Sequence, residues 1–226
     1  MMFRQGILTN SNQVANILRE AILNGEILPG AKLREAEIAG SLSISRTPIR
    51  EAFRILESEG LVILAPNKGV NVITLSDKEI REIYEFRELI ELFAVSKACD
   101  ALTEKELKSL DLCVKQMEEH MEEDNYKEYL KCSTEFHLIY IRMCGNQRII
   151  EAFKKIWNTL LATQILTRSD NKARRETISD HRKILAAIKR KDKSLAKALI
   201  KSHINKGFQL ARTSLQINGE ETHISE

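Results

Sequence analysis

The sequence predicts a mainly α-helical protein: an N-terminal winged helix-turn-helix over residues 1–75, followed by an all-α bundle of six helices over residues 76–226. Three observations lead to this prediction. The 226 residues include only 3 Pro and 9 Gly, so few positions interrupt helical structure. Apolar residues recur at helical spacing from residue 76 almost to the end. The first 75 residues combine short helical stretches with one pair of strand-like segments.

The composition limits the kind of protein this is. With 43% hydrophobic and 30% charged residues, the chain has the balance of a soluble globular protein. It has no apolar leader segment and no run of about 18 apolar residues, so we expect it in the cytoplasm. The formal net charge of only +3 means that any nucleic-acid surface must be local. The four cysteines match no CxxC motif, and we expect reduced thiols.

Two helices open the chain. Residues 12–23 carry apolar side chains at helical spacing, and Asn24-Gly25 supplies a stop. Pro29-Gly30 favours a type II turn. Residues 35–42 predict a second, short helix, which only a tight turn separates from the next one. Two short helices joined in this way form the helix-turn-helix plan.

The third helix, within residues 43–60, has an apolar face beside a basic face. Ser45 is a good N-cap candidate, and Pro48 lies in the first turn, where a missing N–H costs little. Arg46, Arg50 and Arg54 follow one another at i, i+4, i+8. In a helix-turn-helix this N-terminal end enters the DNA major groove, where arginine can chelate guanine. Taken alone, the helix could instead be an ordinary amphipathic helix with a solvated basic face.

A predicted β-hairpin follows this helix. Gly60 ends the helix, and residues 61–64 and 70–73 read as two short strands. At the tip of the hairpin Lys68 can reach a phosphate, and Gly69 lets the backbone approach a groove wall. A hairpin of this kind is the wing of a winged helix, so it strengthens the prediction of DNA binding.

This region contains the segments Leu33-Arg34-Glu35, Ile38-Ala39, residues 43–52 (SISRTPIREA), residues 56–62 (LESEGLV) and Gly69-Val70. Together these segments resemble the winged-helix domain of the GntR superfamily of bacterial transcription regulators. The resemblance implies that Arg34, Arg46, Thr47 and Arg50 contact operator DNA. It also implies that Arg54 reaches a phosphate and that Gly69 marks the wing.

Six helices are predicted for the rest of the chain. Ser76 or Asp77 caps the first, which ends near residue 101, and Thr103 with Glu106 makes a capping box for the second, which ends near residue 123. The other four cover about residues 126–144, 148–168, 172–191 and 193–214. Helices of this number and length form an all-α bundle.

Three histidines lie on apolar stripes of three different bundle helices. His137 shares its stripe with Ser133 and Tyr140, His181 lies among isoleucines, and His203 falls on the stripe of Leu195 and Leu199. A single inward histidine is usually a satisfied core residue, but three would each need a buried partner. Neutral imidazoles that converge in a bundle core suit a first-row metal ion.

An arginine also faces inward in the first bundle helix. Arg87 shares a face with Ile80, Tyr84 and Ile90. A buried unpaired arginine is costly, so two explanations remain. Either Glu91 or another carboxylate pairs with Arg87, or the cavity expects an anionic ligand that the guanidinium grips through two hydrogen bonds.

The bundle region resembles the FCD ligand-binding domain of the FadR branch. The segments that carry this resemblance include Phe136-His137, Gly145-Asn146, residues 180–188 (DHRKILAAI) and His203-Ile204. Many members hold a metal with three histidines and an Asp or Asn four residues before the first. The resemblance therefore implies that His137, His181 and His203 bind a divalent metal such as Zn²⁺ or Ni²⁺. The fourth position is Ser133, a weak ligand, so water or effector oxygens would complete the coordination. Arg87, Ser133 and Tyr140 are the expected effector-binding residues.

We therefore expect a homodimeric, ligand-responsive repressor of transcription that binds double-stranded operator DNA and a small carboxylate, and no membrane. The alternative from another class is a metal-dependent hydrolase with an appended DNA-binding domain. The absence of HExxH and of a Gly-rich phosphate loop disfavours an enzyme. A constitutive architectural DNA binder would need neither Arg87 nor the three inward histidines.

Overall fold

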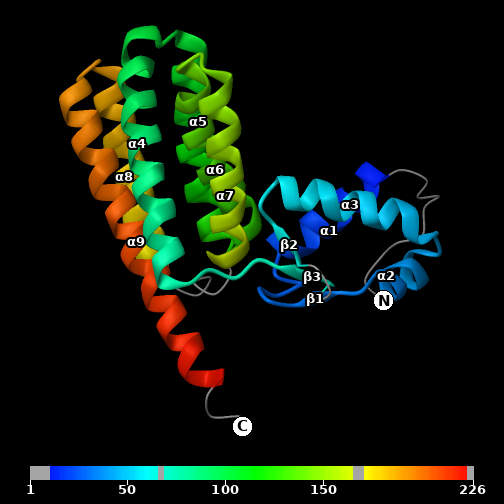
Figure 1. Ribbon diagram of the computed structural model, residues 1–226. Helices are drawn as coiled ribbons and strands as arrows, with labels where there is room; N and C mark the ends of the chain where they lie inside the picture. Colours follow the sequence, from blue (N-terminus) through cyan, green and yellow to red (C-terminus); the bar gives the residue numbers. More distant parts are fainter. Residues whose placement is uncertain (1–10, 66–68, 165–170, 223–226) are drawn as a thin grey trace. The chain divides into compact units, whose positions relative to one another are not determined.

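The computed structural model describes residues 11–65, 69–164 and 171–222 (Figure 1). The chain divides into two compact units, one of residues 1–75 with 154–165 and one of residues 76–153 with 166–226. Helices dominate, and the strands form one small sheet in the first unit. The predicted fold class, a winged helix-turn-helix followed by a helical bundle, is confirmed.

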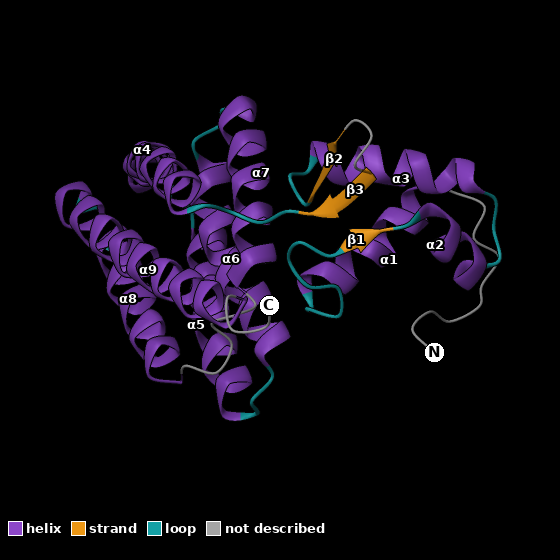
Figure 2. Cartoon of the chain, turned by 60° about the horizontal axis from the view of Figure 1, so that its bottom comes forward, coloured by secondary structure: helices purple, strands orange, loops and turns teal. Residues whose placement is uncertain are grey.

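The part of the first unit within residues 1–75 forms three helices and a three-stranded antiparallel sheet (Figure 2). In chain order the elements are α1 (Ser11–Leu23), β1 (Lys32–Leu33), α2 (Glu35–Leu42), α3 (Arg46–Ser58), β2 (Val62–Ala65) and β3 (Gly69–Val72). Strand β3 lies between the other two, and β1 pairs with it through Lys32 opposite Asn71 and Leu33 opposite Val70. Strand β1 was not predicted, because two residues are too few to show an alternating pattern.

Helix α3 begins at Arg46 as predicted, but its cap differs from the expected one. Ser45 occupies the N-cap position with extended backbone, yet its side chain makes no capping hydrogen bond. The reason is Pro48, which sits at N3 and lacks the amide that a capping hydroxyl usually bonds. The buried face of α3 matches the prediction and packs into the core of this unit with α1. Its members are Ile49, Ala52, Phe53 and Leu56.

Six helices follow in the described part of the chain, and residues 154–164 at the end of the fourth of them group with the first unit. They are α4 (Asp77–Ala101), α5 (Glu104–Glu122), α6 (Tyr126–Met143), α7 (Gln147–Gln164), α8 (Asn171–Lys189) and α9 (Lys193–Thr222). Helix α9 packs along both α4 and α8 (Figure 1). It also continues past residue 214, where the sequence pattern placed its end. The last residues of the predicted 148–168 helix lie outside the described residues.

A capping box starts α4. The Ser76 hydroxyl accepts a hydrogen bond from the Glu79 amide at 3.2 Å, and the Glu79 carboxylate accepts one from the Ser76 amide at 2.8 Å. At α5 the Thr103 hydroxyl accepts from the Glu106 amide at 3.5 Å. The reciprocal bond predicted for Thr103 is not among the described contacts, so the full box belongs to Ser76.

The inward face of α9 differs by one residue from the predicted stripe. Leu195 is 41% exposed, whereas Ala196, Ile200 and Ile204 are buried. The run LAKALIKSHI offers two overlapping stripes, one residue apart, and periodicity alone cannot choose between them. Packing against α4 and α8 selects the second stripe, and His203 is buried on it.

Two further sequence expectations concern the whole chain. All four cysteines are free thiols; Cys99 and Cys113 are buried and the other two half-buried. Within the described ranges, no helix combines the length and the apolar character needed to cross a membrane.

Candidate metal centre and nucleic-acid interface

Three histidines from three helices meet inside the bundle. His137 on α6 and His181 on α8 are fully buried, and His203 on α9 is 8% exposed. One ligand nitrogen from each lies within 4.8 Å of the others. The Nε2 atoms of His137 and His181 are 3.2 Å apart. Three imidazoles this close form a donor set that fits a divalent transition-metal ion.

The outer nitrogen of each ring faces an acceptor. His137 Nδ1 lies 2.9 Å from Glu91 Oε2, and His181 Nδ1 donates to the Thr177 carbonyl oxygen at 2.9 Å. His203 Nδ1 lies 3.7 Å from Asp180 Oδ2. An acceptor at Nδ1 holds the proton on that atom and leaves Nε2 as the metal-binding nitrogen. The arrangement therefore orients all three rings for a common ligand.

A buried carboxylate links the histidines to Arg87. Glu91 Oε1 accepts from Arg87 Nε, and Glu91 Oε2 accepts from the Tyr140 hydroxyl. The Tyr140 oxygen is also 2.6 Å from His137 Nδ1. Arg87 is 3% exposed and Glu91 is fully buried. Of the two explanations for the inward arginine, the structure shows pairing with Glu91. The role of Glu91 beside a histidine was not predicted, because the contact joins residues 46 positions apart.

The surroundings fix the charges of these groups. Burial by itself raises the pKa of the Glu91 carboxyl, but the charge of Arg87 and the hydrogen bonds from His137 and Tyr140 lower it overall. Burial lowers the pKa of His137 to about 4, although Glu91 opposes this shift. Burial, together with the neighbouring His203 and His137, lowers the pKa of His181 well below 6.5. Both rings are therefore neutral near pH 7, which is the form that binds a metal.

Ser133 and Tyr140 lie on the same face of α6 as His137. Ser133 is 8% exposed and comes one helical turn before the histidine, and Tyr140 is fully buried. A serine hydroxyl is a weaker metal ligand than a carboxylate, so the centre relies on its imidazoles.

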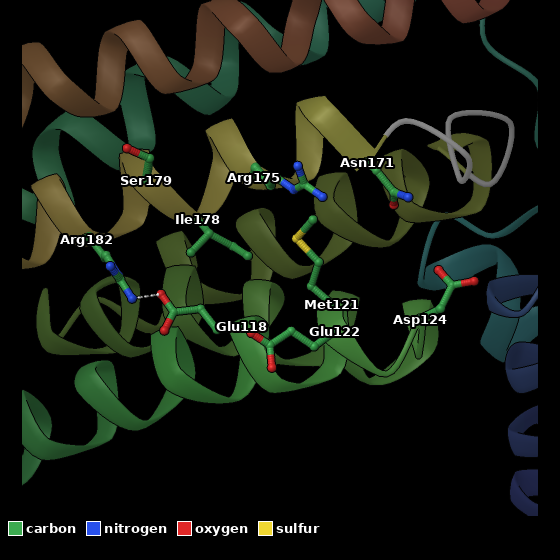
Figure 3. Close-up of a pocket in the computed structure, with 9 residues that line it drawn as sticks. All are labelled: Glu118, Met121, Glu122, Asp124, Asn171, Arg175, Ile178, Ser179 and Arg182. Carbon is green, nitrogen blue, oxygen red and sulfur yellow. Dashed lines mark ion pairs between the residues drawn. The ribbon is translucent and has the colours of Figure 1, made fainter.

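A surface groove between α5 and α8 is a different feature (Figure 3). Its volume is about 750 Å³, and its lining is strongly charged. Arg182 and Glu118 face each other across it and form an ion pair (Figure 3). None of the three histidines lines this groove. Arg182 is already paired with Glu118 there, and the three clustered histidines lie elsewhere, so the histidine centre is the better candidate for a ligand site.

The residues predicted to contact DNA lie on exposed faces of the first unit. Arg46, Thr47, Arg50 and Arg54 are all exposed on α3. Arg34, at the N-cap of α2, pairs with Glu37 at 2.7 Å. Arg50 pairs with Glu35 at 2.8 Å, and Arg54 pairs with Glu51 at 2.9 Å. Three of the predicted arginines are thus held by carboxylates.

The wing is described only in part. Lys68 lies outside the described residues, so its predicted phosphate contact cannot be placed. Gly69 is exposed with φ +86°, a left-handed conformation that favours glycine. A Cβ at this position would lie 3.3 Å from Lys32 Cε. Lys32 of β1 therefore adds a basic side chain beside the wing, which the sequence pattern did not single out.

Acidification should destabilise the metal-free protein between pH 7 and pH 5. The folded-state pKa values of His137 and His181 lie below the ordinary 6.5, so the unfolded chain binds more protons in this range. The free energy of unfolding should therefore fall as the pH falls. Urea denaturation of chelator-treated protein at several pH values measures it.

His120, which is half-buried beside Glu123 and is not one of the three clustered histidines, provides the matched control for this experiment. A His181→Gln variant should show a flatter pH dependence, and a His120→Gln variant should keep that of the wild type. Identical slopes for wild type and His181→Gln would contradict the assignment of the effect to the buried ring.

Comparison with known proteins agrees with this architecture. The family model of the FCD domain matches residues 82–206, and that of the bacterial regulatory proteins, gntR family, matches residues 10–72. The gluconate operon transcriptional repressor of Bacillus subtilis is 31% identical over 192 residues, which cover 81% of this chain and 77% of that protein. The HTH-type transcriptional regulator YdhC of Bacillus subtilis is 29% identical over 196 residues, which cover 85% and 87%.

A solved structure shows the same fold. Escherichia coli McbR/YncC superposes with a TM-score of 0.80 over 92% of this chain and 100% of that chain, at 24% identity. Both matched domains and these relatives are those of transcription regulators, so the hydrolase alternative is not supported. The chain belongs to the GntR family of bacterial regulatory proteins, in the FadR-like branch with an FCD domain, and is a DNA-binding transcription regulator rather than an enzyme.

Proposed function

We propose that this regulator is a homodimeric repressor whose FCD domain senses a small carboxylate at a divalent metal held by His137, His181 and His203. The observation that carries the proposal is the convergence of the three rings with each Nδ1 facing an acceptor. Zn²⁺ and Ni²⁺ both accept imidazole ligands. Such an ion would supply a positive centre with open coordination positions for oxygen ligands.

The charge balance around the histidines favours an anionic effector. Arg87 pairs with Glu91, and Lys206 donates to both oxygens of Asp180 at 2.9 and 2.8 Å. These two cations and two anions cancel, and the His137 and His181 rings are neutral, so a divalent ion would add positive charge. A buried charge is costly unless it is matched. Ser133 would add a hydroxyl that orients the carboxylate, and Arg87 and Tyr140, which are both bonded to Glu91, would complete the proposed effector site.

The name of one relative supports the proposal of repression and of a carboxylate effector. The relative that is 31% identical is named a repressor of the gluconate operon, and gluconate is itself a carboxylate. A ligand changes the conformation of a protein only if it binds two conformations unequally. The effector would therefore favour one arrangement of the dimer, and with it one spacing of the two recognition helices. Because the target is DNA, we place the protein in the cytoplasm.

The surface proposed to read DNA consists of Arg34, Arg46, Thr47, Arg50 and Arg54 with the wing residues Lys68 and Gly69. The exposed N-terminal end of α3 supports this assignment for Arg46, Thr47 and Arg50. Arg54 lies about two helical turns after Arg46 on α3 and would contact a phosphate.

An apolar stripe on α4 supports a homodimer. Phe86, Leu89 and Phe93 are 43%, 70% and 45% exposed and follow one another at i, i+3, i+7. Large apolar side chains that share one helix face are typical of an interaction surface. A second copy would cover the same stripe by two-fold symmetry and would present two recognition helices to a pseudo-palindromic operator.

Metal should be lost when two of the histidines are removed. A His137→Ala/His181→Ala variant should carry little Zn²⁺ or Ni²⁺ after purification, because one imidazole with water cannot hold a divalent ion tightly. Elemental analysis measures the metal per chain. The control variant His120→Ala, changed outside the three clustered histidines, should keep the metal content of the wild type. Equal metal in the double variant and the wild type would refute the site.

A carboxylate that fits should raise the melting temperature of the metal-loaded protein. A ligand that binds only the folded state at about 100 times its Kd adds about 2.7 kcal/mol. Gluconate, lactate and succinate are suitable probes, and glucose is a matched neutral control for gluconate. The shift should vanish in the His137→Ala/His181→Ala variant. A shift of equal size in that variant would place the binding elsewhere.

Arg46→Ala should weaken binding to a selected operator by about 1–3 kcal/mol, because an arginine at the N-terminal end of α3 can chelate guanine. Footprinting and anisotropy titration at fixed salt measure this loss. The wild-type footprint should show two symmetric half-sites, as a dimer requires. An unchanged affinity would exclude Arg46 from the interface, and a single half-site would contradict the dimer.

A further inference from the structure

Glu35 joins the two helices of the helix-turn-helix through Arg50. Its Oε2 atom accepts a hydrogen bond from Arg50 Nε at 2.8 Å, across 15 residues of chain. The Glu35 side chain is 31% exposed and the Arg50 side chain is 62% exposed. The other two described pairs on this surface, Arg34–Glu37 and Arg54–Glu51, each join residues three apart. Only the Glu35–Arg50 pair of these three therefore fixes an α3 side chain relative to α2.

The bonded atom decides which edge of the guanidinium is left for DNA. Arginine reads guanine through two parallel N–H groups that meet O6 and N7. Because Arg50 Nε points at Glu35, the edge made by the two terminal nitrogens is the one presented away from the carboxylate. The pair therefore restricts both the rotamer of Arg50 and the plane in which it can meet a base.

The Glu35–Arg50 pair affects the orientation of the Arg50 side chain more than the stability of the fold. A solvent-exposed ion pair adds little to the stability of the fold. A free arginine side chain, however, loses much rotamer freedom when it binds, and a side chain already held in the binding conformation loses less. A carboxylate on a DNA-binding surface also repels phosphates, so it lowers non-specific affinity. Glu35 would thus raise specificity while it reduces general attraction to DNA.

We propose that Glu35 is a positioning residue for base recognition: its carboxylate holds Arg50 in the orientation that reads one guanine of each operator half-site. This inference rests on the proposed contact between Arg50 and DNA. It extends that contact by assigning part of the base preference to a residue of α2 that touches no base.

The test uses the full-length protein and an operator recovered by selection from a randomised duplex library. Anisotropy titrations at fixed salt compare this operator, its single-base-pair variants and an unrelated duplex. Arg50→Ala should lower the preference for one guanine by about tenfold. Glu35→Ala should lower the preference at the same base pair, while its affinity for the unrelated duplex stays equal or rises.

Three further variants separate positioning from a structural effect. Glu35→Gln should keep the preference, because its amide oxygen can still accept from Arg50 Nε. The double variant Glu35→Ala/Arg50→Ala should discriminate no less than Arg50→Ala alone, since both changes remove one interaction. Glu51→Ala, which removes the carboxylate beside Arg54, should leave the preference for that guanine unchanged. If the alanine variant does not fold, Glu35→Asp, with a shorter side chain, should lose the preference in its place.

The contrary outcomes are distinct. If Arg50→Ala relaxes one base pair and Glu35→Ala keeps the wild-type preference there, positioning is overturned and the Arg50 contact stands. If Glu35→Ala relaxes a different base pair, Glu35 acts on its own and the inference fails. If Arg50→Ala changes no base preference, both the contact and the inference fail.

Discussion

The histidine centre depends on the contacts of the buried Glu91 carboxylate. A carboxylate without solvent exposure is costly unless charges and hydrogen bonds match it. Glu91 meets this requirement with Arg87 on its own helix and with His137 and Tyr140 on α6. One group thus compensates a buried arginine, orients a histidine and ties α4 to α6. Loss of Glu91 would therefore remove the carboxylate that contacts both Arg87 and the His137 ring.

Helical periodicity predicted most of the fold and the composition of the histidine centre. Side chains that repeat at 3.6 residues must share a face, so the inward positions of His137 and His181 follow from their apolar neighbours. Periodicity could not resolve the register of α9, where two stripes overlap and Leu195 proved to be exposed. It also could not find β1, which has two residues and depends on pairing with β3.

The contacts that orient the site could not be predicted from the sequence, for a different reason. Glu91 reaches His137 from 46 residues away, and Glu35 reaches Arg50 from 15 residues away. Local patterns carry no information on which side chains meet after the helices pack. The missing cap at Ser45 is an exception, since Pro48 at N3 could have revealed it from the sequence. In both units, an acidic residue holds a side chain of a proposed site in place: Glu35 holds Arg50, and Glu91 holds the His137 ring.

In the proposed mechanism, a carboxylate bound in the FCD domain changes the affinity of the winged helix for DNA. Linkage requires the two ligands to change each other's affinity by the same factor. The direct measurement is operator affinity of metal-loaded protein with and without a saturating carboxylate, paired with carboxylate affinity with and without saturating operator. The factor by which the carboxylate changes operator affinity should equal the factor by which the operator changes carboxylate affinity, and both should differ clearly from one. A carboxylate that binds at the histidine centre with the same affinity in the presence and absence of operator would contradict the claim.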